Sequence, residues 1–449
     1  MKKLLSLLLV AALVFSFAAC GSGSSGGGSS AAPSGGDDGG EKSGPIEIEY
    51  WHCMSGELER AVMAQVDAFN ASQDEVYVNA SYQGNFDDTN AKYQSALVAG
   101  NAPVLGMVER MNCASYWDAD QVYKLNDFIA RDNFDIDAIK QYMSYSTFNG
   151  DIVGVPVNRS VFCVYYNIDM AEAAGLDVND PPSNWEEFYA WIDALTIKEN
   201  GEVKVYGYEP PVYNLNPYSG YIQQCGGSFY NEDFTDIGFN NEAGRLVYGF
   251  YEHLRDSEGV KFPPKTDSFE TCKSDFYSQN AAMIFESCAA MVAILENTEG
   301  AGTFRCGAFP FPAYHDNPVY TTGGSNICMF AGHTDEEYEA GWKFIKYLYE
   351  PESCGGFAAA TGYLPLTKAA YESKVYSEAL ANWPQLSVPF NASVYVNDTP
   401  PCTVHGEITK VINTYNDQFL LESSISIDDL LNGISKEAQE ILKDYTPIG

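Results

Sequence analysis

The apolar and polar positions along most of the chain follow two periods. Apolar residues at every second position predict strands over 46–50 and 76–82. Apolar residues spaced three or four positions apart predict helices over 58–69 and 92–99, and an apolar run predicts a third strand over 104–108. The order strand, helix, strand, helix, strand is typical of a mainly parallel sheet with helices on both faces. This part of the sequence therefore predicts an α/β fold.

Later segments carry the start and stop signals of further helices. Residues 183–186 and 334–337 fit the capping box, in which a Ser or Thr and a Glu together close the first turn of a helix. The second of these helices should end before Pro351, because the residue before a proline avoids helical backbone angles. Helical spacing over 430–442 predicts a final amphipathic helix. The 449 residues fit two α/β units of about 200 residues each.

The first residues predict export from the cytoplasm. Lys2 and Lys3 precede an apolar run over 4–17. A short apolar run behind a basic start is typical of a cleavable signal peptide, and it is shorter than the roughly 20 residues of a membrane span. We therefore predict a signal peptide over residues 1–19.

Cys20 and the stretch that follows it predict a tether. The two small residues before Cys20 resemble the lipobox of bacterial lipoproteins, in which the cysteine is acylated, although that motif usually has Leu where this chain has Phe17. Cleavage of the signal peptide without lipid attachment is the alternative. The segment 20–45 is rich in Gly and Ser, which predicts a flexible linker. We therefore expect an extracytoplasmic protein, at the cell surface or in the periplasm, that is lipid-anchored to the membrane.

Composition excludes several classes of partner. The chain has 61 acidic and 25 basic residues, which gives a net charge of −36 at pH 7. Binding to nucleic acid or to an anionic membrane surface relies on Lys and Arg, so neither fits this charge. Apolar residues make up 45% of the chain, which is far too many for a disordered protein.

No motif for catalysis, for a metal or for a cofactor stands out. The five His are isolated, and neither a C-x-x-C pair, an H-E-x-x-H pair nor a P-loop occurs. The ten Cys after Cys20 are spread singly, and we predict that most are free thiols. A carboxylate pair for glycoside hydrolysis cannot be assigned among so many acidic residues. The 31 Tyr, 25 Phe and 6 Trp suit a ligand with apolar and hydroxyl faces, such as a sugar, although most rings should lie in the core.

A series of short motifs runs along the chain. In order they are YWHCMSGELE at 50–59, YQGN at 82–85, GNAP at 100–103, PVNRS at 156–160, VYYN at 164–167, PSNW at 182–185, TGGS at 322–325 and TGYLP at 361–365. Their order and spacing resemble the extracellular solute-binding proteins of carbohydrate-type ABC importers, a family that includes maltose-binding proteins. The likeness is strongest to the glycerol-3-phosphate-binding members, and it covers about residues 46 to 445.

The resemblance implies a two-lobed fold like that of periplasmic binding proteins of type II. Each lobe is a mainly parallel sheet flanked by helices, and hinge strands cross between the lobes. The implied N-terminal lobe comprises residues 46–159 and 287–324, and the C-terminal lobe comprises residues 160–286 and 325–449. The ligand is held in the cleft between the lobes and is then delivered to ABC permease subunits.

The ligand contacts that the resemblance implies are Phe86, Glu109, Ser160, Ser287, Gly324 and Tyr363. Glu109 follows an apolar strand, at the end where open α/β sheets bind ligands. Ser160 and Ser287 lie at expected crossings between the lobes, where a turn role is equally open, and Gly324 also fits a simple turn. We add Trp185, for which a core position is the alternative, and His52, which follows the first strand.

We therefore predict a substrate-binding lipoprotein of an ABC transporter, without catalytic activity, cofactor or metal. Its expected ligand is a sugar, an oligosaccharide or a polyol-type solute. Where similar proteins use an arginine and a tyrosine for a phosphate ester, this chain has Thr409, beside Lys410, and Phe86. A glycerol-3-phosphate or glycerophosphodiester binding protein is the alternative, because Lys410 or backbone N–H groups can hold phosphate. A secreted glycoside hydrolase and a surface receptor that signals without transport are more remote.

Overall fold

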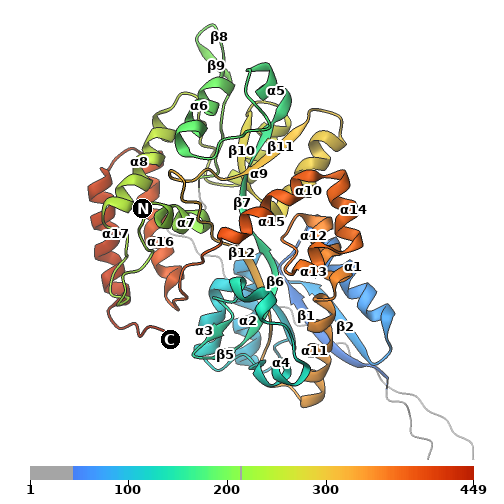
Figure 1. Cartoon of the computed structure of the whole chain (residues 1–449). Coiled ribbons are helices and arrows are strands. Elements are labelled where there is room, and N and C mark those ends of the chain that lie inside the picture. The colour runs from blue at the N-terminus through green and yellow to red at the C-terminus, as the bar shows by residue number, and fades with distance from the viewer. Residues whose placement is uncertain (1–43, 213–214, 449) are drawn as a thin grey trace, which may run out of the picture. The chain divides into compact units, whose positions relative to one another are not determined.

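The computed structural model describes residues 44–212 and 215–448 (Figure 1). The predicted signal peptide, Cys20 and nearly all of the predicted linker lie outside these residues. Within them, no helix is both long enough and apolar enough to cross a membrane. The residues from Pro45 onward form one unit.

Five strands form the first sheet, in the order β2-β1-β3-β12-β6. Their bounds are β1 Ile46–His52, β2 Val76–Tyr82, β3 Leu105–Glu109, β6 Gly154–Ser160 and β12 Gly323–Met329. β1 pairs in parallel with β2 and β3, whereas β12 pairs antiparallel with β3 and β6. The three strands predicted near the N-terminus are therefore confirmed, together with their parallel arrangement. The antiparallel β12, from a distant part of the chain, had no signal in the local sequence pattern.

Predicted helices pack on this sheet, together with one over 351–361 that was not predicted from the sequence. The helices are α1 Gly56–Ser72, α2 Phe86–Ala99, α11 Asp335–Leu348 and α12 Pro351–Thr361. α1 packs on β2, α2 on β3 and α11 on β1, and α12 packs against α1. The buried side of α1 consists of Ala61, Val62, Val66 and Phe69, which supply the helical spacing in the sequence. α11 ends at Leu348, and Pro351 begins the next helix, where its missing N–H costs nothing.

The two predicted capping boxes have different outcomes. Thr334 caps α11 as predicted: its side chain accepts from the Glu337 N–H, and the Glu337 side chain accepts from the Thr334 N–H. At α6 (Trp185–Leu195) the cap is Asn184, whose side chain accepts from the Glu187 N–H. The prediction of Ser183 as the cap was therefore wrong by one residue, because Asn caps a helix as well as Ser does.

The second sheet has the strand order β10-β7-β11. The bounds are β7 Phe162–Asn167, β10 Met283–Ser287 and β11 Cys306–Pro310, and both outer strands pair antiparallel with β7. Single parallel bridges extend this sheet, because Glu209 pairs with Ile284 and Tyr208 pairs with Val260. The α/β class is confirmed, but this sheet combines antiparallel strands with parallel bridges.

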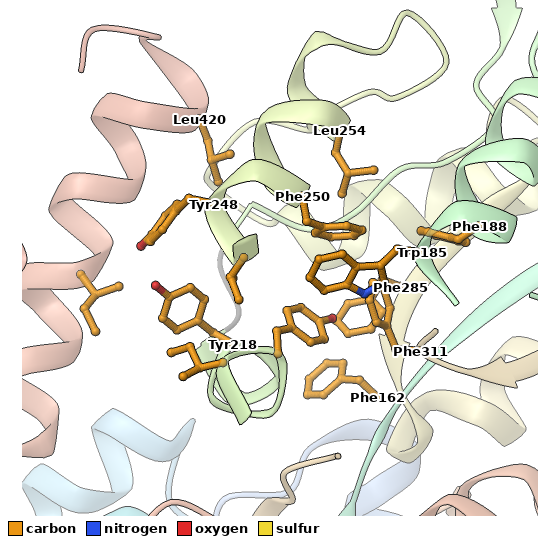
Figure 2. Close-up of a cluster of buried hydrophobic side chains, with 14 of the residues drawn as sticks. Phe162, Trp185, Phe188, Tyr218, Tyr248, Phe250, Leu254, Phe285, Phe311 and Leu420 are labelled. Carbon is orange, nitrogen blue, oxygen red and sulfur yellow. The ribbon is translucent and has the colours of Figure 1, made fainter. Parts of the chain in front are cut away.

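Aromatic side chains fill the core beside the second sheet. The helices around this core are α6, α7 Leu215–Gln224, α8 Glu242–Asp256, α16 His405–Asn416 and α17 Ile427–Leu442. Figure 2 shows Trp185, Phe250 and Phe311 side by side, with Phe188 and Tyr218 at the edges of the group. The predicted C-terminal amphipathic helix is confirmed as α17, which buries one face against α8 and α16.

The chain passes between the two sheets at three places. β6 continues through Val161 directly into β7, residues 311–322 join β11 to β12, and residues 396–404 lead into α16. Each sheet has its own apolar core, so the predicted two-lobed architecture is confirmed. The lobe boundaries stay a prediction. Because β12, α11 and α12 pack with the first sheet, their packing favours moving the boundary predicted at 324 toward the C-terminus.

The remaining elements are short or lie at the periphery. They are α3 Cys113–Asp118, α4 Asn126–Asp132, β4 Thr147–Phe148, β5 Asp151–Ile152, α5 Ile168–Ala173, β8 Ile197–Glu199, β9 Glu202–Val205, α9 Ser268–Tyr277, α10 Met291–Leu295, α13 Lys368–Tyr371, α14 Lys374–Asn382 and α15 Ser387–Ala392. In this structure no disulfide bond joins any of the ten cysteines within the described part of the chain, and most of them were predicted to be free thiols.

Candidate functional site

Strand ends from both sheets meet where the chain crosses between them. Ser160, the last residue of β6, pairs with Gly323, the first residue of β12. Ser287 ends β10, and the next residue, Cys288, donates its backbone N–H to Val161 O at 2.9 Å. Ser160 and Ser287 therefore lie on neighbouring segments at the crossing, which is where the sequence predicted these two serines.

Tyr363 reaches the same crossing from the end of α12. The next residue, Leu364, donates its N–H to Arg159 O at 2.8 Å, which ties this loop to β6. The Tyr363 ring stacks on Phe357 with 5.6 Å between centroids, and its hydroxyl lies 3.9 Å from Met54 Sδ. Tyr363 is only 5% exposed, so it would contact a ligand only if the loop or the lobes moved.

Gly324 has a structural reason to be glycine. Its φ is +111°, a conformation that side chains rarely adopt. A Cβ atom at this position would lie 2.5 Å from the backbone oxygen of Asn158 on β6. Close pairing of β12 with β6 therefore requires glycine here, whether or not a ligand binds.

Glu109 ends β3 and faces β12, where its pairing partner is Ser325. Burial raises the pKa of the Glu109 carboxyl, Arg110 opposes this rise, and Asp87 at the start of α2 adds to it. Asn112 donates to the carboxylate at 3.3 Å. The position at the carboxyl end of a central strand is the one that the sequence predicted.

His52 and Phe86 lie at the edge of the first sheet that is formed by the carboxyl ends of β1 and β2. His52 ends β1 and pairs with Tyr82, the last residue of β2. Burial lowers the pKa of the fully buried His52 ring, which keeps the ring neutral at pH 7. Phe86 begins α2 just after β2, and it is among the exposed large apolar residues. An exposed ring at this edge is available to a ligand, whereas His52 is covered.

Trp185 lies apart from the other candidates. Its ring packs on Phe250 with centroids 4.6 Å apart, and its indole N–H donates to Pro312 O at 3.2 Å (Figure 2). The side chain is buried in the aromatic core of the second sheet. This environment is the core position that the sequence left open as the alternative for Trp185.

A buried ion pair at the crossing was missed by the sequence reasoning. Arg110, directly after Glu109, lies 3.8 Å from Asp398, and their side chains are 3% and 0% exposed. The Arg110 guanidinium covers the Tyr145 ring at 4.3 Å from its centroid. Asp398 accepts hydrogen bonds from the Thr322 N–H at 2.7 Å and from its hydroxyl at 2.8 Å. Arg110 could have been suspected from its place at a strand end, but Asp398 has no local signal.

Arg159 is a second buried guanidinium at this crossing, and its side chain is fully buried. It donates to the backbone oxygens of Asn158, Ser325 and Tyr142 and to the side chain of Asn326. Burial, with repulsion from Arg110, lowers the pKa of Arg159 to about 10. Its hydrogen bonds tie β6 to β12 just before β6 crosses to the second sheet.

The first turn of α16 also faces the cluster. Tyr230 and His405 Nδ1 are hydrogen-bonded at 2.6 Å. Burial and repulsion from Arg110 lower the pKa of His405 to about 3, so its ring is neutral at pH 7. Further along this helix, Thr409 is half-buried and Lys410 is exposed. Arg110 and Arg159 are therefore the buried cationic groups at the crossing, whereas Lys410 lies exposed on α16.

The chemistry of this arrangement is recognition by hydrogen bonds and charge. Carboxylate, guanidinium, hydroxyl and aromatic groups from both lobes and from all three crossings come together there. Among the described residues, no cluster of His, Cys, Asp and Glu could hold a metal ion. Polar groups that converge between lobes are typical of a small-molecule binding site.

Comparison with known proteins gives one consistent result. A family described as bacterial extracellular solute-binding protein matches residues 64–386. A protein from Yersinia pestis named sn-glycerol-3-phosphate-binding periplasmic protein UgpB is 27% identical over 338 residues, which are 73% of this chain and 75% of the relative. The protein of the same name from Escherichia coli K12 is 25% identical over 350 residues, which are 74% of this chain and 77% of the relative.

Solved structures share the fold. UgpB from Mycobacterium tuberculosis, in complex with glycerophosphocholine, aligns with a TM-score of 0.77 at 20% identity, over 89% of this chain and 99% of that one. The cyclic alpha-maltosyl-1,6-maltose binding protein from Arthrobacter globiformis aligns with a TM-score of 0.73 at 23% identity, over 89% and 100%. At such identities the likeness concerns the fold alone.

Proposed function

The chain belongs to the bacterial extracellular solute-binding protein family, and from this premise we propose that it captures a small polar solute between its two lobes and delivers it to an ABC permease. The observation that carries the proposal is the convergence of Ser160, Ser287 and Tyr363 at the crossing between the lobes. These residues lie far apart in the sequence, and each was expected to contact a ligand. A hinge region that collects polar groups suits a protein that closes around a solute.

The ligand that we propose is a neutral or weakly charged saccharide or polyol. Phe86 offers an exposed ring face, and Glu109 offers a carboxylate for hydroxyl groups. Thr409 stands where the resemblance implies an arginine for a phosphate ester. Arg110 is already engaged by Asp398, and a net charge of −36 opposes the approach of an anion.

A phosphate ester is the second candidate, and two observations favour it. The guanidinium groups of Arg110 and Arg159 are both buried at the crossing, and Arg is the preferred side chain for phosphate. The curated relatives at 25% and 27% identity are named as glycerol-3-phosphate-binding proteins. Glycerol-3-phosphate and glycerophosphodiesters therefore belong in any ligand screen.

Titration calorimetry distinguishes the two candidates. The protein is titrated with maltose, maltotriose, glycerol, glycerol-3-phosphate and glycerophosphocholine. We expect a saccharide or polyol to bind with a Kd near micromolar, about −8 kcal/mol, and the phosphate esters to bind weakly. Tight binding of glycerol-3-phosphate, lost on Arg110→Met or Lys410→Ala, would establish the phosphate-ester alternative. Release of reducing sugar from a glycan would instead point to a hydrolase.

Variants test the placement of the site. Glu109→Gln and Phe86→Ala should weaken the best ligand at least tenfold, because each removes a direct contact at the sheet edge. Trp185→Phe is the matched control, since this aromatic residue lies in the core of the second sheet. Equal affinity in wild type and both site variants would exclude this edge as the binding site.

We also propose that Cys20 carries lipid and tethers the protein to the membrane. Solute capture near a permease benefits from a tether, and Cys20 begins the Gly/Ser-rich segment. Cys20→Ser should release the protein into the medium with its ligand affinity unchanged, because the unit that carries the candidate site begins only at Pro45. An unmodified N-terminal peptide of wild-type protein found in the culture medium would exclude the anchor.

A further inference from the structure

Two thiols approach each other beside the candidate site. Cys113 Sγ and Cys328 Sγ are 3.9 Å apart, and both side chains are completely buried in one apolar cluster. Cys113 begins α3, and Cys328 lies in β12, 215 residues later. Gly154 on β6 leaves the room for this contact, because a Cβ atom there would lie 2.7 Å from Cys328 Sγ.

We propose that Cys113 and Cys328 form an intramolecular disulfide bond in the exported protein. The S–S bond is about 2.05 Å long, so the two sulfur atoms must come about 2 Å closer. β12 is fixed between β3 and β6, whereas Cys113 follows a 3-10 turn, Arg110–Asn112, and begins a helix of six residues. Cys113 is therefore the partner that moves. Members of this family are extracellular, and disulfides persist in that compartment.

The oxidant is a small-molecule or protein disulfide, and the reaction balances as two thiol–disulfide exchanges. One Cys thiolate attacks the oxidant and releases its first thiol, and the second cysteine then attacks the mixed disulfide and releases the other. The two cysteines lose two electrons and two protons, and the oxidant becomes two thiols. The contact with Cys113 and burial raise the pKa of Cys328, so reactive thiolate is scarce once the protein has folded. The bond therefore forms during folding, before the cluster closes.

The cross-link connects to the candidate site through two contacts. Asn326 Nδ2 donates to Cys113 Sγ at 3.3 Å, and Asn326 Oδ1 accepts from Arg159. Glu109 O lies 3.9 Å from Cys113 Sγ, one helical turn away. Movement of Cys113 therefore displaces the turn Arg110–Asn112, which carries Arg110 and follows directly after Glu109. Oxidised and reduced protein should differ in ligand affinity for this reason.

Refolding under defined redox conditions tests the proposal. The full chain is unfolded in urea with a reductant and refolded with oxidised and reduced glutathione, or with reductant alone. Free thiols are then alkylated, and the protein is digested without reduction. We expect one peptide pair that links Cys113 to Cys328, only in the glutathione sample, and a Tm several degrees higher there. Recovery of both cysteines in alkylated form, or in other pairings, overturns the proposal.

Cysteine variants supply the matched controls. Cys225→Ala removes a half-buried thiol after α7 and should keep the linked peptide and the redox-dependent Tm. Cys113→Ala should lose both, and its circular dichroism reports whether it folds. If Cys113→Ala does not fold, the peptide map of Cys225→Ala shows whether Cys113 and Cys328 are linked. The peptide map does not depend on the ligand, so this proposal and the proposed function can fail separately.

Discussion

The core of the second lobe and the crossing between the lobes both bury large side chains, but those of the core are apolar and those of the crossing are charged. Beside the second sheet, Trp185 packs on Phe250, and Phe250 in turn packs on Phe311 (Figure 2). At the crossing, Arg110 and Asp398 are charged side chains that are almost completely buried. Apolar packing is non-directional and tolerates changes that conserve volume, whereas a buried charge needs a partner at a defined position.

This difference indicates which part of the molecule needs its side chains at defined positions. Burying an ion pair often gives no net stability compared with an apolar pair of the same shape. Charges that remain buried at a hinge, beside the predicted ligand contacts, are therefore explained better by recognition or by control of lobe movement than by stability. The aromatic core requires no such explanation, because burial of its apolar area is sufficient.

The largest effect is expected when one charge of the crossing loses its partner. Asp398→Ala leaves the buried Arg110 guanidinium without its carboxylate and removes the acceptor of two Thr322 hydrogen bonds. We expect the free energy of unfolding to fall by about 3–5 kcal/mol. Urea unfolding followed by tryptophan fluorescence measures this change.

The matched control is an exposed ion pair. Arg245 and Asp428 are hydrogen-bonded at 2.9 Å, but their side chains are 48% and 66% exposed. Asp428→Ala should cost less than about 1 kcal/mol, because water screens the pair and replaces it. Equal costs for Asp398→Ala and Asp428→Ala would contradict the view that the crossing depends on its charges.

The same comparison explains what the sequence could predict. Periodicity identified α1, β2 and α17, because each element buries one regular face. It could not identify the place of β12 in the first sheet, since strand order depends on contacts between distant segments. Apolar patterns describe single elements, and the order of strands in a sheet is set by all of them together.

In the candidate site too, some residues were predictable from the sequence and others were not. Glu109 was predicted at a strand end and ends β3, and Ser160 was predicted at a crossing between the lobes and ends β6 at that crossing. Their role as ligand contacts stays a prediction. The pairing of Arg110 with Asp398 was not predictable, because 61 acidic residues offered no means of choosing one. Trp185 lies in the aromatic core beside the second sheet, and a tryptophan after a helix cap carries no signal that distinguishes a core role from a ligand contact.

A second prediction concerns Glu286, the buried carboxyl next to Ser287 at the crossing. Burial raises the pKa of Glu286 to about 7, against an ordinary value of 4.5. Between these two values the unfolded chain has lost a proton that the folded protein keeps, so stability falls as pH rises. The fall amounts to about 3 kcal/mol for this group and is complete above about pH 7.

Glu286→Gln keeps the shape of the side chain and cannot ionise. We expect this variant to be more stable than wild type at pH 8 by up to about 3 kcal/mol, with the difference closing as pH falls toward 4.5. Urea unfolding at a series of pH values measures the difference. Glu199→Gln, at an exposed position on β8, is the control. If the stability difference between Glu286→Gln and wild type does not change with pH, ionisation of Glu286 is not its cause.

Among the three buried sites, the smallest effect is expected in the aromatic core, where Trp185→Phe retains a ring against Phe250. The variant loses the indole N–H that donates to Pro312 O, together with part of the ring volume. We expect a cost of about 1–2 kcal/mol, because the change is apolar to apolar and one hydrogen bond is lost. Urea unfolding measures the cost, and calorimetry with the best ligand should show an unchanged Kd. A tenfold loss of affinity would instead make Trp185 a ligand contact, and the contrast between an aromatic core and a charged recognition site would then fail.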